Sequence, residues 1–299
     1  MKETLSVPSR RFEIHMHSCH SDGEYSPAGL VRLARNNGVS ILSLTDHDTF
    51  SGLPEFLESA AEAGIEAFPG IEITVAYRDF NLHLLAYFRD LESIRPELNR
   101  RVEKMKQQRE ERMHELIARI NEVVPERFRG AIRFENVQRA SEGVLARPHL
   151  AAEMVRLGIV RDVREAFDEY LVEYNIEKKN LTAFEALRMV RESGGIPVLA
   201  HPGERTYSLV NPQKGRLPEH APEMVAELKE HGLMGLECVY PYHEKTGQVD
   251  FFVNLARSFG LIVTGSRDFH GAPTNQKPAL LGATPMEPAW LDRFREAWG

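Results

Sequence analysis

Two histidines separated by one residue, His15 and His17, stand near the start of the chain, and a Ser-Asp-Gly sequence containing Asp22 follows them. The preceding residues Arg11-Phe12-Glu13 predict a short strand, along which side chains alternate between two faces. The two imidazoles therefore share a face and can bind one metal ion, with Asp22 as an oxygen ligand nearby. For a His-x-His sequence taken alone, an exposed polar strand face is the commoner explanation.

Histidines and acidic residues recur at the ends of other predicted strands. His47, His201, Asp268 and His270 all come just after such strands, and parallel α/β barrels build their active sites at that end. With their neighbours they complete a set of nine candidate ligands: His15, His17, Asp22, His47, Glu72, His83, His201, Asp268 and His270. Imidazole and carboxylate suit zinc, iron or manganese, and carboxylates can bridge ions, so the set predicts more than one ion.

Two members of this set also have structural explanations. His83 lies within an apolar strand, where a single histidine is more often a core residue with satisfied hydrogen bonds. Asp22 can serve to shape a turn. The joint placement of nine such residues is poorly explained in this way, and it favours a metal site.

The composition of the 299-residue chain is that of an ordinary globular protein, with 42% hydrophobic and 27% charged residues. A net charge of -7 excludes a globally basic nucleic-acid binder but not a nucleotide substrate, because a metal cluster can hold phosphate on an acidic protein. Two cysteines make no disulfide framework. Residues 1–11 lack the apolar core of a signal peptide, and no apolar run spans a bilayer. We expect a cytoplasmic protein with no membrane partner, and infer no stable protein partner.

Strands and helices alternate in two parts of the chain, which predicts an α/β fold. Expected strands cover residues 11–13, 40–44, 65–68, 80–88, 196–200, 235–239 and 261–264. Between them, Ser26 begins a helix that Gly38 ends, a second helix stops at Gly64, and Thr182 begins another with a capping box to Glu185.

Residues 92–178 contain helical patterns and no strand signal. We therefore predict a helical substrate-recognition domain inserted into a discontinuous α/β domain formed by residues 1–91 and 179–299. The charge of the helical block is explained most simply by a solvated helix face.

The ordered motifs resemble the polymerase and histidinol phosphatase (PHP) family. The matching pieces are His15-Met16-His17 with Ser21-Asp22-Gly23, Thr45-Asp46-His47-Asp48, Gly70-Ile71-Glu72, His83, Leu199-Ala200-His201-Pro202 and Asp268-Phe269-His270-Gly271. The resemblance implies a distorted seven-stranded barrel of PHP type with surrounding helices and a trinuclear metal site. The helical block, with Ala146-Arg147-Pro148-His149-Leu150, resembles the branch that acts on nucleoside 3′,5′-bisphosphates and on the 5′ ends of short RNA.

The resemblance also sorts the ligands. It implies a first ion held by His15, His17 and Asp268 with Glu72 bridging, a second held by Glu72, His83 and His201, and a third held by Asp22, His47 and His270. Up to three divalent ions (Mn, Fe or Zn) would then activate water, and metal-bound hydroxide would attack phosphorus without a side-chain nucleophile.

Candidate substrate contacts lie outside the ligand set. Arg147, His149 and Arg205 are expected to meet a second phosphate or the leaving group, although Arg147 and the proline after it also fit a plain helix start. Arg267 stands before Asp268, where the family often has Gly-Gly-Ser-Asp; it either meets phosphate or points to solvent. Three more residues are expected either to line the pocket or to belong to the core or the surface: Glu237, Tyr240 and His243.

Three functions follow from these features. The first is a metal-dependent phosphoric ester hydrolase, either a nucleoside 3′,5′-bisphosphate phosphatase or a 5′-3′ exonuclease acting on phosphorylated nucleotides or short oligonucleotides. The second is histidinol-phosphate phosphatase, which needs an acidic contact for the amino alcohol. The third is a non-catalytic PHP interaction module, which a degraded ligand set would indicate. The intact set of nine ligands and the Arg-Pro-His sequence favour the first function.

Overall fold

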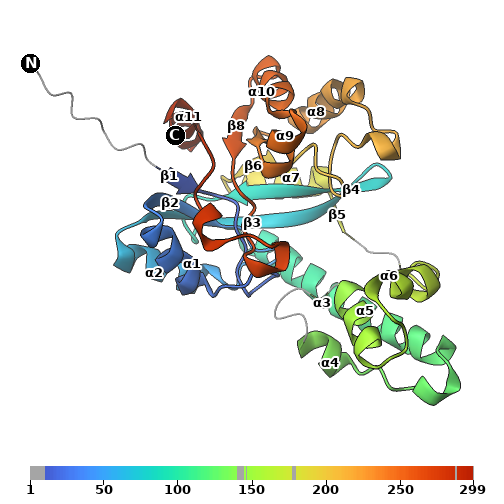
Figure 1. Ribbon diagram of the computed structural model, residues 1–299. Helices are drawn as coiled ribbons and strands as arrows, with labels where there is room; N and C mark the ends of the chain where they lie inside the picture. Colours follow the sequence, from blue (N-terminus) through green and yellow to red (C-terminus); the bar gives the residue numbers. More distant parts are fainter. Residues whose placement is uncertain (1–10, 140–144, 146, 177–179, 287, 299) are drawn as a thin grey trace, which may run out of the picture.

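A mixed β-sheet flanked by helices forms the larger part of the molecule, as the alternating pattern predicted (Figure 1). The computed structural model describes residues 11–139, 145, 147–176, 180–286 and 288–298. The strands follow the path β1 (Arg11–Glu13), β2 (Val39–Leu44), β3 (Glu66–Tyr77), β4 (Phe80–Tyr87), β6 (Ile196–Leu199), β7 (Gly235–Val239) and β8 (Ile262–Gly265), while β5 (Leu181–Thr182) pairs with β3. The predicted α/β class is confirmed.

The sheet is not parallel throughout. β4 runs antiparallel to both β3 and β6, whereas the other neighbouring strands on the path pair in parallel. The expected strand at 65–68 is longer than predicted, because β3 continues through Pro69 and Gly70. The alternating residues Ile71, Ile73 and Val75 sustain it by pairing with β4. Glu72 therefore projects from the interior of a strand.

The two ends of the sheet path approach each other next to the histidine motif. β1 ends at Glu13, so His15 and His17 follow the strand. An isolated parallel bridge between Met16 and Phe269 joins the segments that follow β1 and β8. The His17 N–H donates to the Phe269 carbonyl at 2.9 Å, which brings the first motif beside the last one.

Helices cover the sheet on both sides. α1 and α2 pack on each other and on the β2–β3 region, and α7, α8 and α10 pack near β6 to β8 (Figure 1). The bounds are α1 (Pro27–Asn36), α2 (Leu53–Ala63), α7 (Ala183–Glu192), α8 (Ala221–Glu230), α9 (Pro241–Thr246), α10 (Val249–Ser258) and α11 (Pro288–Glu296). Short 3₁₀ turns occur at Glu126–Phe128, Pro212–Lys214, Pro218–His220, Ala272–Thr274 and Pro278–Leu280.

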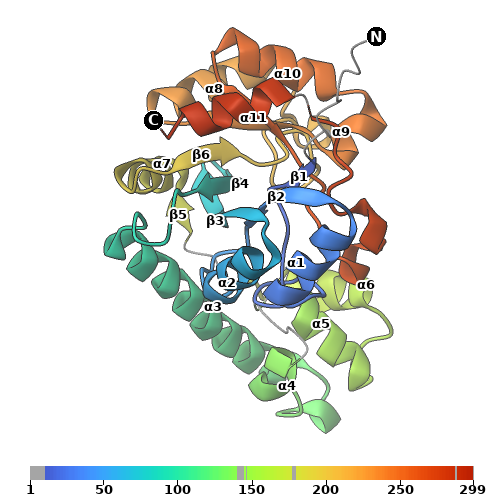
Figure 2. The same ribbon diagram turned by 90° about the vertical axis from the view of Figure 1, so that its left-hand side faces the viewer.

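A second, entirely helical unit with its own apolar core lies to one side of the sheet (Figures 1 and 2). It consists of the later part of α3 (Pro96–Val123), α4 (Phe134–Arg139), α5 (Arg147–Arg156), α6 (Val163–Ala166) and a π-helical turn, Phe167–Leu171. This unit falls in the segment predicted as an insert, whose boundaries at 92 and 178 stay a prediction. Residues 1–10, 140–144, 146, 177–179, 287 and 299 of the predicted domains lie outside the described part of the chain.

The long helix α3 belongs to both cores. Leu98, Val102 and Met105 pack in the core beside the sheet. Met113 and Leu116, further along the same helix, pack in the helical unit. Figure 2 shows the helix running from the sheet into that unit. Among the described residues, no helix combines the length and the apolar character needed to cross a membrane.

The predicted capping box at the start of α7 is present, and it gives a test of stability. The Glu185 N–H donates to the Thr182 hydroxyl at 3.2 Å, while the Thr182 N–H donates to the Glu185 carboxylate at 3.0 Å. Thr182→Ala should lower the free energy of unfolding by about 1 kcal/mol, since a helix N–H loses its acceptor. Urea unfolding should show a lower midpoint at an unchanged slope, with Thr182→Ser as the control that stays near wild type. An unchanged midpoint in Thr182→Ala would contradict a stabilising cap.

Candidate metal centre

All nine predicted ligands converge, and their donor atoms form three overlapping groups in which the atoms lie within 4.8 Å of one another. The groups are His17, Asp22, His47 and His270; His15, His17, Glu72 and Asp268; and His47, Glu72 and His83. His201 lies outside these groups but contacts Glu72. The side chains come from the two ends of the sheet path, from the β2 and β6 ends, and from within β3 and β4.

The Glu72 carboxylate lies at the middle of this cluster and is fully buried. One oxygen, Oε2, lies near three imidazole nitrogens: His15 Nε2 at 3.2 Å, His17 Nε2 at 3.2 Å and His47 Nδ1 at 3.1 Å. The other, Oε1, lies near His83 Nδ1 at 2.8 Å and His201 Nε2 at 3.1 Å. Five histidines therefore share one carboxylate, a geometry suited to a bridging ligand.

Several nitrogen and oxygen atoms of the cluster are buried and make no hydrogen bond of suitable geometry among the described residues, although some lie close to a Glu72 oxygen. They are His17 Nε2, His47 Nδ1, His83 Nδ1, His201 Nδ1 and Asp268 Oδ1. Buried polar groups are normally hydrogen-bonded, and orphaned ones need a partner. Clustered imidazoles and carboxylates with orphaned donor atoms fit cations, so the cluster is able to bind metal ions.

The buried carboxylates of the cluster attract positive charge. Burial alone would raise the pKa of Glu72, but the imidazoles of His83, His47 and His15 hold it well below its ordinary value. Burial likewise opposes ionisation of Asp268, and the surrounding histidines lower its pKa. Both carboxylates are therefore ionised at neutral pH and attract cations.

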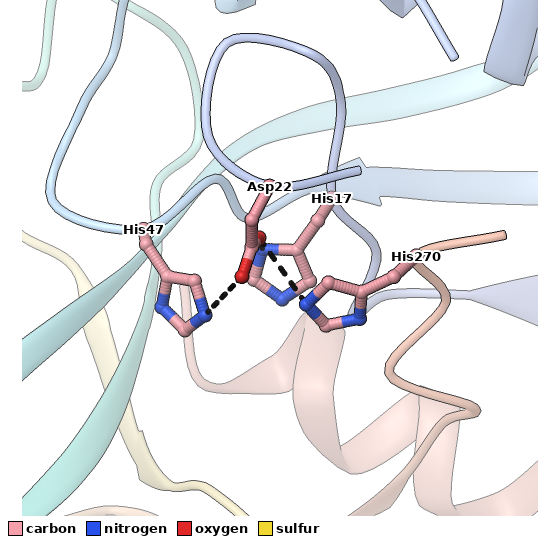
Figure 3. Close-up of side chains that lie close together, drawn as sticks. All are labelled: His17, Asp22, His47 and His270. Atoms are coloured by element: carbon pink, nitrogen blue, oxygen red, sulfur yellow. Dashed lines mark ion pairs between the residues drawn. The ribbon is translucent and has the colours of Figure 1, made fainter. Parts of the chain in front are cut away.

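Asp22 is positioned by a tight turn that requires glycine. A Cβ atom on Gly23 would lie 2.0 Å from the carbonyl oxygen of His17, so a larger residue would displace the turn. In this turn Asp22 lies 3.6 Å from His47 Nε2 and 3.2 Å from His270 Nε2 (Figure 3). The Ser-Asp-Gly sequence thus places a carboxylate between imidazoles from two distant segments.

The grouping agrees with most of the expected assignment. His15, His17, Glu72 and Asp268 form one group, as expected, and Asp22, His47 and His270 form another together with His17. In the third group His47, and not His201, joins Glu72 and His83. Which residues bind which ion stays a prediction.

Glu237, expected either to line the pocket or to belong to the core or surface, contacts two of the candidate ligands. Its buried carboxylate accepts a hydrogen bond from the His201 N–H at 2.9 Å and lies 2.9 Å from His15 Nδ1. A carboxylate at Nδ1 fixes the imidazole tautomer in which Nε2 carries the lone pair for a metal. The Tyr240 hydroxyl donates to Asp268 at 3.2 Å, so this residue also contacts a candidate ligand.

A cavity of about 820 Å³ adjoins the cluster and extends toward the helical unit. Its lining includes the candidate ligands Asp22, His47 and His83, and also the predicted substrate contacts Arg147 and His149. The lining residues that the sequence did not indicate include Arg78, Asp79, Arg109, Arg112 and Tyr207. The cavity thus joins candidate ligands to a group of arginines.

Three of the four arginines among the described lining residues are held in place by the helical unit and by the loop after β2. Arg109 donates to the Asp48 carboxylate, and Arg112 donates to the Ile176 carbonyl at 2.6 Å. Arg147 donates to the Leu171 carbonyl at 3.1 Å, in the π-helical turn. Burial and the positive charges of Arg147 and Arg109 lower the pKa of Arg112. This mutual repulsion would be relieved by a bound anion.

Three other predicted substrate contacts are not among the residues described as lining this cavity. Arg205 lies over the Tyr242 ring. Arg267 is paired with both carboxylate oxygens of Glu244, at 2.7 and 2.8 Å, and does not point freely into solvent. His243 is fully buried: its Nε2 accepts from the Gly203 N–H at 2.9 Å and its Nδ1 contacts the Cys238 carbonyl.

A sequence signal for Arg109 was present in α3. The buried residues Val102, Met105, Arg109, Met113 and Leu116 follow one another at spacings of three or four. An arginine in an apolar helical stripe is not a solvated surface charge, so the general interpretation of this helix was wrong at Arg109.

Comparisons with known proteins agree with this geometry. The family profile described as PHP domain matches residues 13–185. The chain is 26% identical over 266 residues to a 5′-3′ exoribonuclease of Haemophilus influenzae, covering 88% of this chain and 90% of that protein. It is 26% identical to a 3′,5′-nucleoside bisphosphate phosphatase of Chromobacterium violaceum, covering 86% of each. A crystal structure from Bifidobacterium adolescentis, provisionally assigned as a metal-dependent phosphoesterase, superposes with a TM-score of 0.74 at 25% identity, covering 98% of each chain.

The position of Glu237 predicts an effect on metal binding. Glu237→Gln replaces one carboxylate oxygen with an NH₂ group. If this group faces the His201 N–H, two donors meet. If it faces His15 Nδ1, it donates to that nitrogen and forces the other tautomer of His15. Metal affinity should fall about 10- to 100-fold, measured by titration against a competing chelator. The matched control is Glu230→Gln, at an exposed position in α8. Equal affinities in both variants would show that Glu237 does not orient the ligands.

Proposed function

Because this chain belongs to the PHP domain family, we propose that it hydrolyses the phosphate ester at the 3′ oxygen of nucleotides that also carry a 5′-phosphate. The substrates are nucleoside 3′,5′-bisphosphates and short 5′-phosphorylated oligonucleotides. The observation that carries the proposal is the single cavity lined both by metal-centre residues and by Arg109, Arg112 and Arg147. One phosphate would occupy the metal centre while a second pairs with Arg112 and Arg147.

Both substrate types fit one arrangement of the cavity. With the 5′-phosphate on the arginines, the phosphate at the metal centre is the one attached to O3′. Hydrolysis adds water to phosphorus, breaks the P–O3′ bond and leaves the proton on O3′. The leaving group is a nucleoside 5′-monophosphate in either case. The other product is inorganic phosphate from a bisphosphate, or the shortened chain with a new 5′-phosphate from an oligonucleotide.

Each part of the chain has a defined task in this arrangement. The nine clustered side chains hold up to three divalent ions, of manganese, iron or zinc, which when bound lower the pKa of water and neutralise phosphoryl charge. Glu237 holds His15 in one tautomer. Arg112, Arg147 and His149 bind the second phosphate, and Tyr207, whose ring stacks on His83 with centroids 4.0 Å apart, forms an apolar wall beside the ester.

The alternative functions find less support. The amino group of histidinol phosphate requires an acidic contact, and beyond the candidate ligand Asp22 the described lining offers one carboxylate, Asp79, against four arginines. A non-catalytic module would be expected to have lost ligands, whereas all nine are present and lie together. Arg205, Arg267 and His243 take no part in the proposed phosphate site, because their contacts lie elsewhere.

The proposal predicts more than one metal ion per chain. Elemental analysis of protein purified without chelator, or reconstituted with manganese, should give a molar ratio above one, because the donor groups are too many for a single ion. Removal of the ions with a chelator should abolish hydrolysis and lower the melting temperature, since ions bound only by the folded state stabilise it. A ratio of one or less after reconstitution would contradict the multinuclear site.

Substitution of Arg147 tests the second phosphate site. Arg147→Ala should lower kcat/KM for a nucleoside 3′,5′-bisphosphate by roughly tenfold to a hundredfold, because a charge-assisted contact of roughly 1.5–3 kcal/mol is lost. The value for an aryl phosphate, which has one phosphate, should change little. The exposed Arg164, paired with Asp168 on the helical unit, supplies the control substitution Arg164→Ala. An unchanged ratio between the two substrates would remove Arg147 from the recognition site.

A further inference from the structure

A second, smaller cavity of about 130 Å³ lies next to the first. It is lined by His20, Asp48, Thr49, Lys106, Arg109, Glu110, Gln138 and Leu145. Arg109 and Leu145 line both cavities, so they form a common wall. His20 precedes the ligand Asp22 by two residues and Asp48 follows the ligand His47, so the second cavity also begins beside the metal centre.

The polar groups of this cavity are held in place. His20 Nδ1 lies 2.8 Å from the Ser51 hydroxyl, and the Thr49 hydroxyl donates to the same Ser51 oxygen at 3.0 Å. Asp48 accepts from the Thr74 N–H at 2.8 Å and from the Thr74 hydroxyl at 3.0 Å, in addition to its ion pair with Arg109. The negative charge of Asp48 is therefore already compensated.

The common wall carries a buried cation with an unused donor. Arg109 is only 9% exposed, and its Nε has no hydrogen-bond partner among the described residues. Lys106 lies three residues earlier in α3, on the same side of the helix, and lines only the second cavity. The charges of Arg109 and Asp48 compensate each other, and Lys106 balances Glu110, so the donors available to an anion are the Lys106 ammonium and the unpartnered Nε of Arg109.

The size of the cavity limits what it can hold. A volume of about 130 Å³ corresponds to a few water molecules, which is enough for a phosphate group but not for a nucleoside. A nucleoside 3′,5′-bisphosphate has no group left for this position, since its two phosphates occupy the arginines and the metal centre. An oligonucleotide continues past the cleaved bond and brings a further phosphate.

We propose that the second cavity binds the phosphodiester that follows the cleaved one in a 5′-phosphorylated oligonucleotide. This inference rests on the proposed function and deepens it. The 5′-phosphate lies on Arg112 and Arg147, the scissile phosphate at the metal centre, and the next phosphate at Lys106 and Arg109. The cavity therefore distinguishes an oligonucleotide from a bisphosphate and fixes the direction in which the chain lies.

The test compares substrates that differ by one phosphodiester, using the metal-loaded protein. A dinucleotide pNpN has only the scissile phosphodiester, whereas a trinucleotide pNpNpN adds the one assigned to the second cavity. Wild type should cleave the first bond of the trinucleotide with a kcat/KM about tenfold above that of the dinucleotide, through the added charge-assisted contact. Lys106→Ala should bring this ratio close to one, and Lys106→Arg should retain it.

The matched control is Lys104→Ala, an exposed lysine two residues earlier in the same helix that is not among the described lining residues of either cavity. It should keep the wild-type ratio. For the trinucleotide, Lys106→Ala should also flatten the slope of log(kcat/KM) against log salt by about 0.7, the contribution of one phosphate contact on a single strand.

The outcomes separate this inference from the proposed function. If wild type shows no preference for the trinucleotide, or if Lys106→Ala keeps the preference, the phosphate site in the second cavity is overturned and the proposed function is left intact. Failure of the metal-loaded wild type to hydrolyse the bisphosphate pNp and both oligonucleotides would overturn the proposed function, and this inference with it.

Discussion

The arrangement of the rest of the site depends on the burial of the Glu72 carboxylate. A carboxylate without access to water is strongly unfavourable unless it is paired, and here the pairing comes from imidazoles of several distant segments. Backbone hydrogen bonds join the segment after β2 to β3: the Asp48 N–H donates to the Glu72 carbonyl at 2.9 Å, and the Glu72 N–H donates to the Asp46 carbonyl at 3.3 Å. The backbone contacts that join these segments to β3 therefore also place the candidate ligands around Glu72.

The chain accepts strained backbone where it delivers these side chains. Five described non-glycine residues have positive φ angles, which most residues avoid, and three of them, Asp48, His201 and Asp268 at 49°, 26° and 49°, lie in or next to the cluster. Such conformations persist where surrounding contacts enforce them, and they concentrate at functional sites. Here they turn the chain sharply just past strands or at the candidate ligands themselves.

Local sequence patterns predicted much of the fold and the cluster, because strand alternation, helix caps and histidines at strand ends each depend on residues that are close in the sequence. The capping box of Thr182 and the strand at Gly235–Val239 are examples. Contacts between distant segments could not be predicted in this way. The antiparallel course of β4, the support of His15 by Glu237 and the pairing of Arg267 with Glu244 each depend on how remote segments meet. Arg109 is intermediate, since its helical stripe was visible but its partner Asp48 was not.

The sharing of α3 between two apolar cores bears on how this architecture can vary. A domain joined by a linker can be exchanged or deleted without exposing the core of its host. Here one uninterrupted 28-residue helix contributes Leu98 and Val102 to the first core and Met113 and Leu116 to the second. Excision of the helical unit at the domain boundary would cut through this helix and take Arg109 from Asp48, beside the candidate ligand His47. The helical unit is thus a fixed part of the molecule, and changes in substrate preference would arise more readily by substitution on α3 than by exchange of the whole unit.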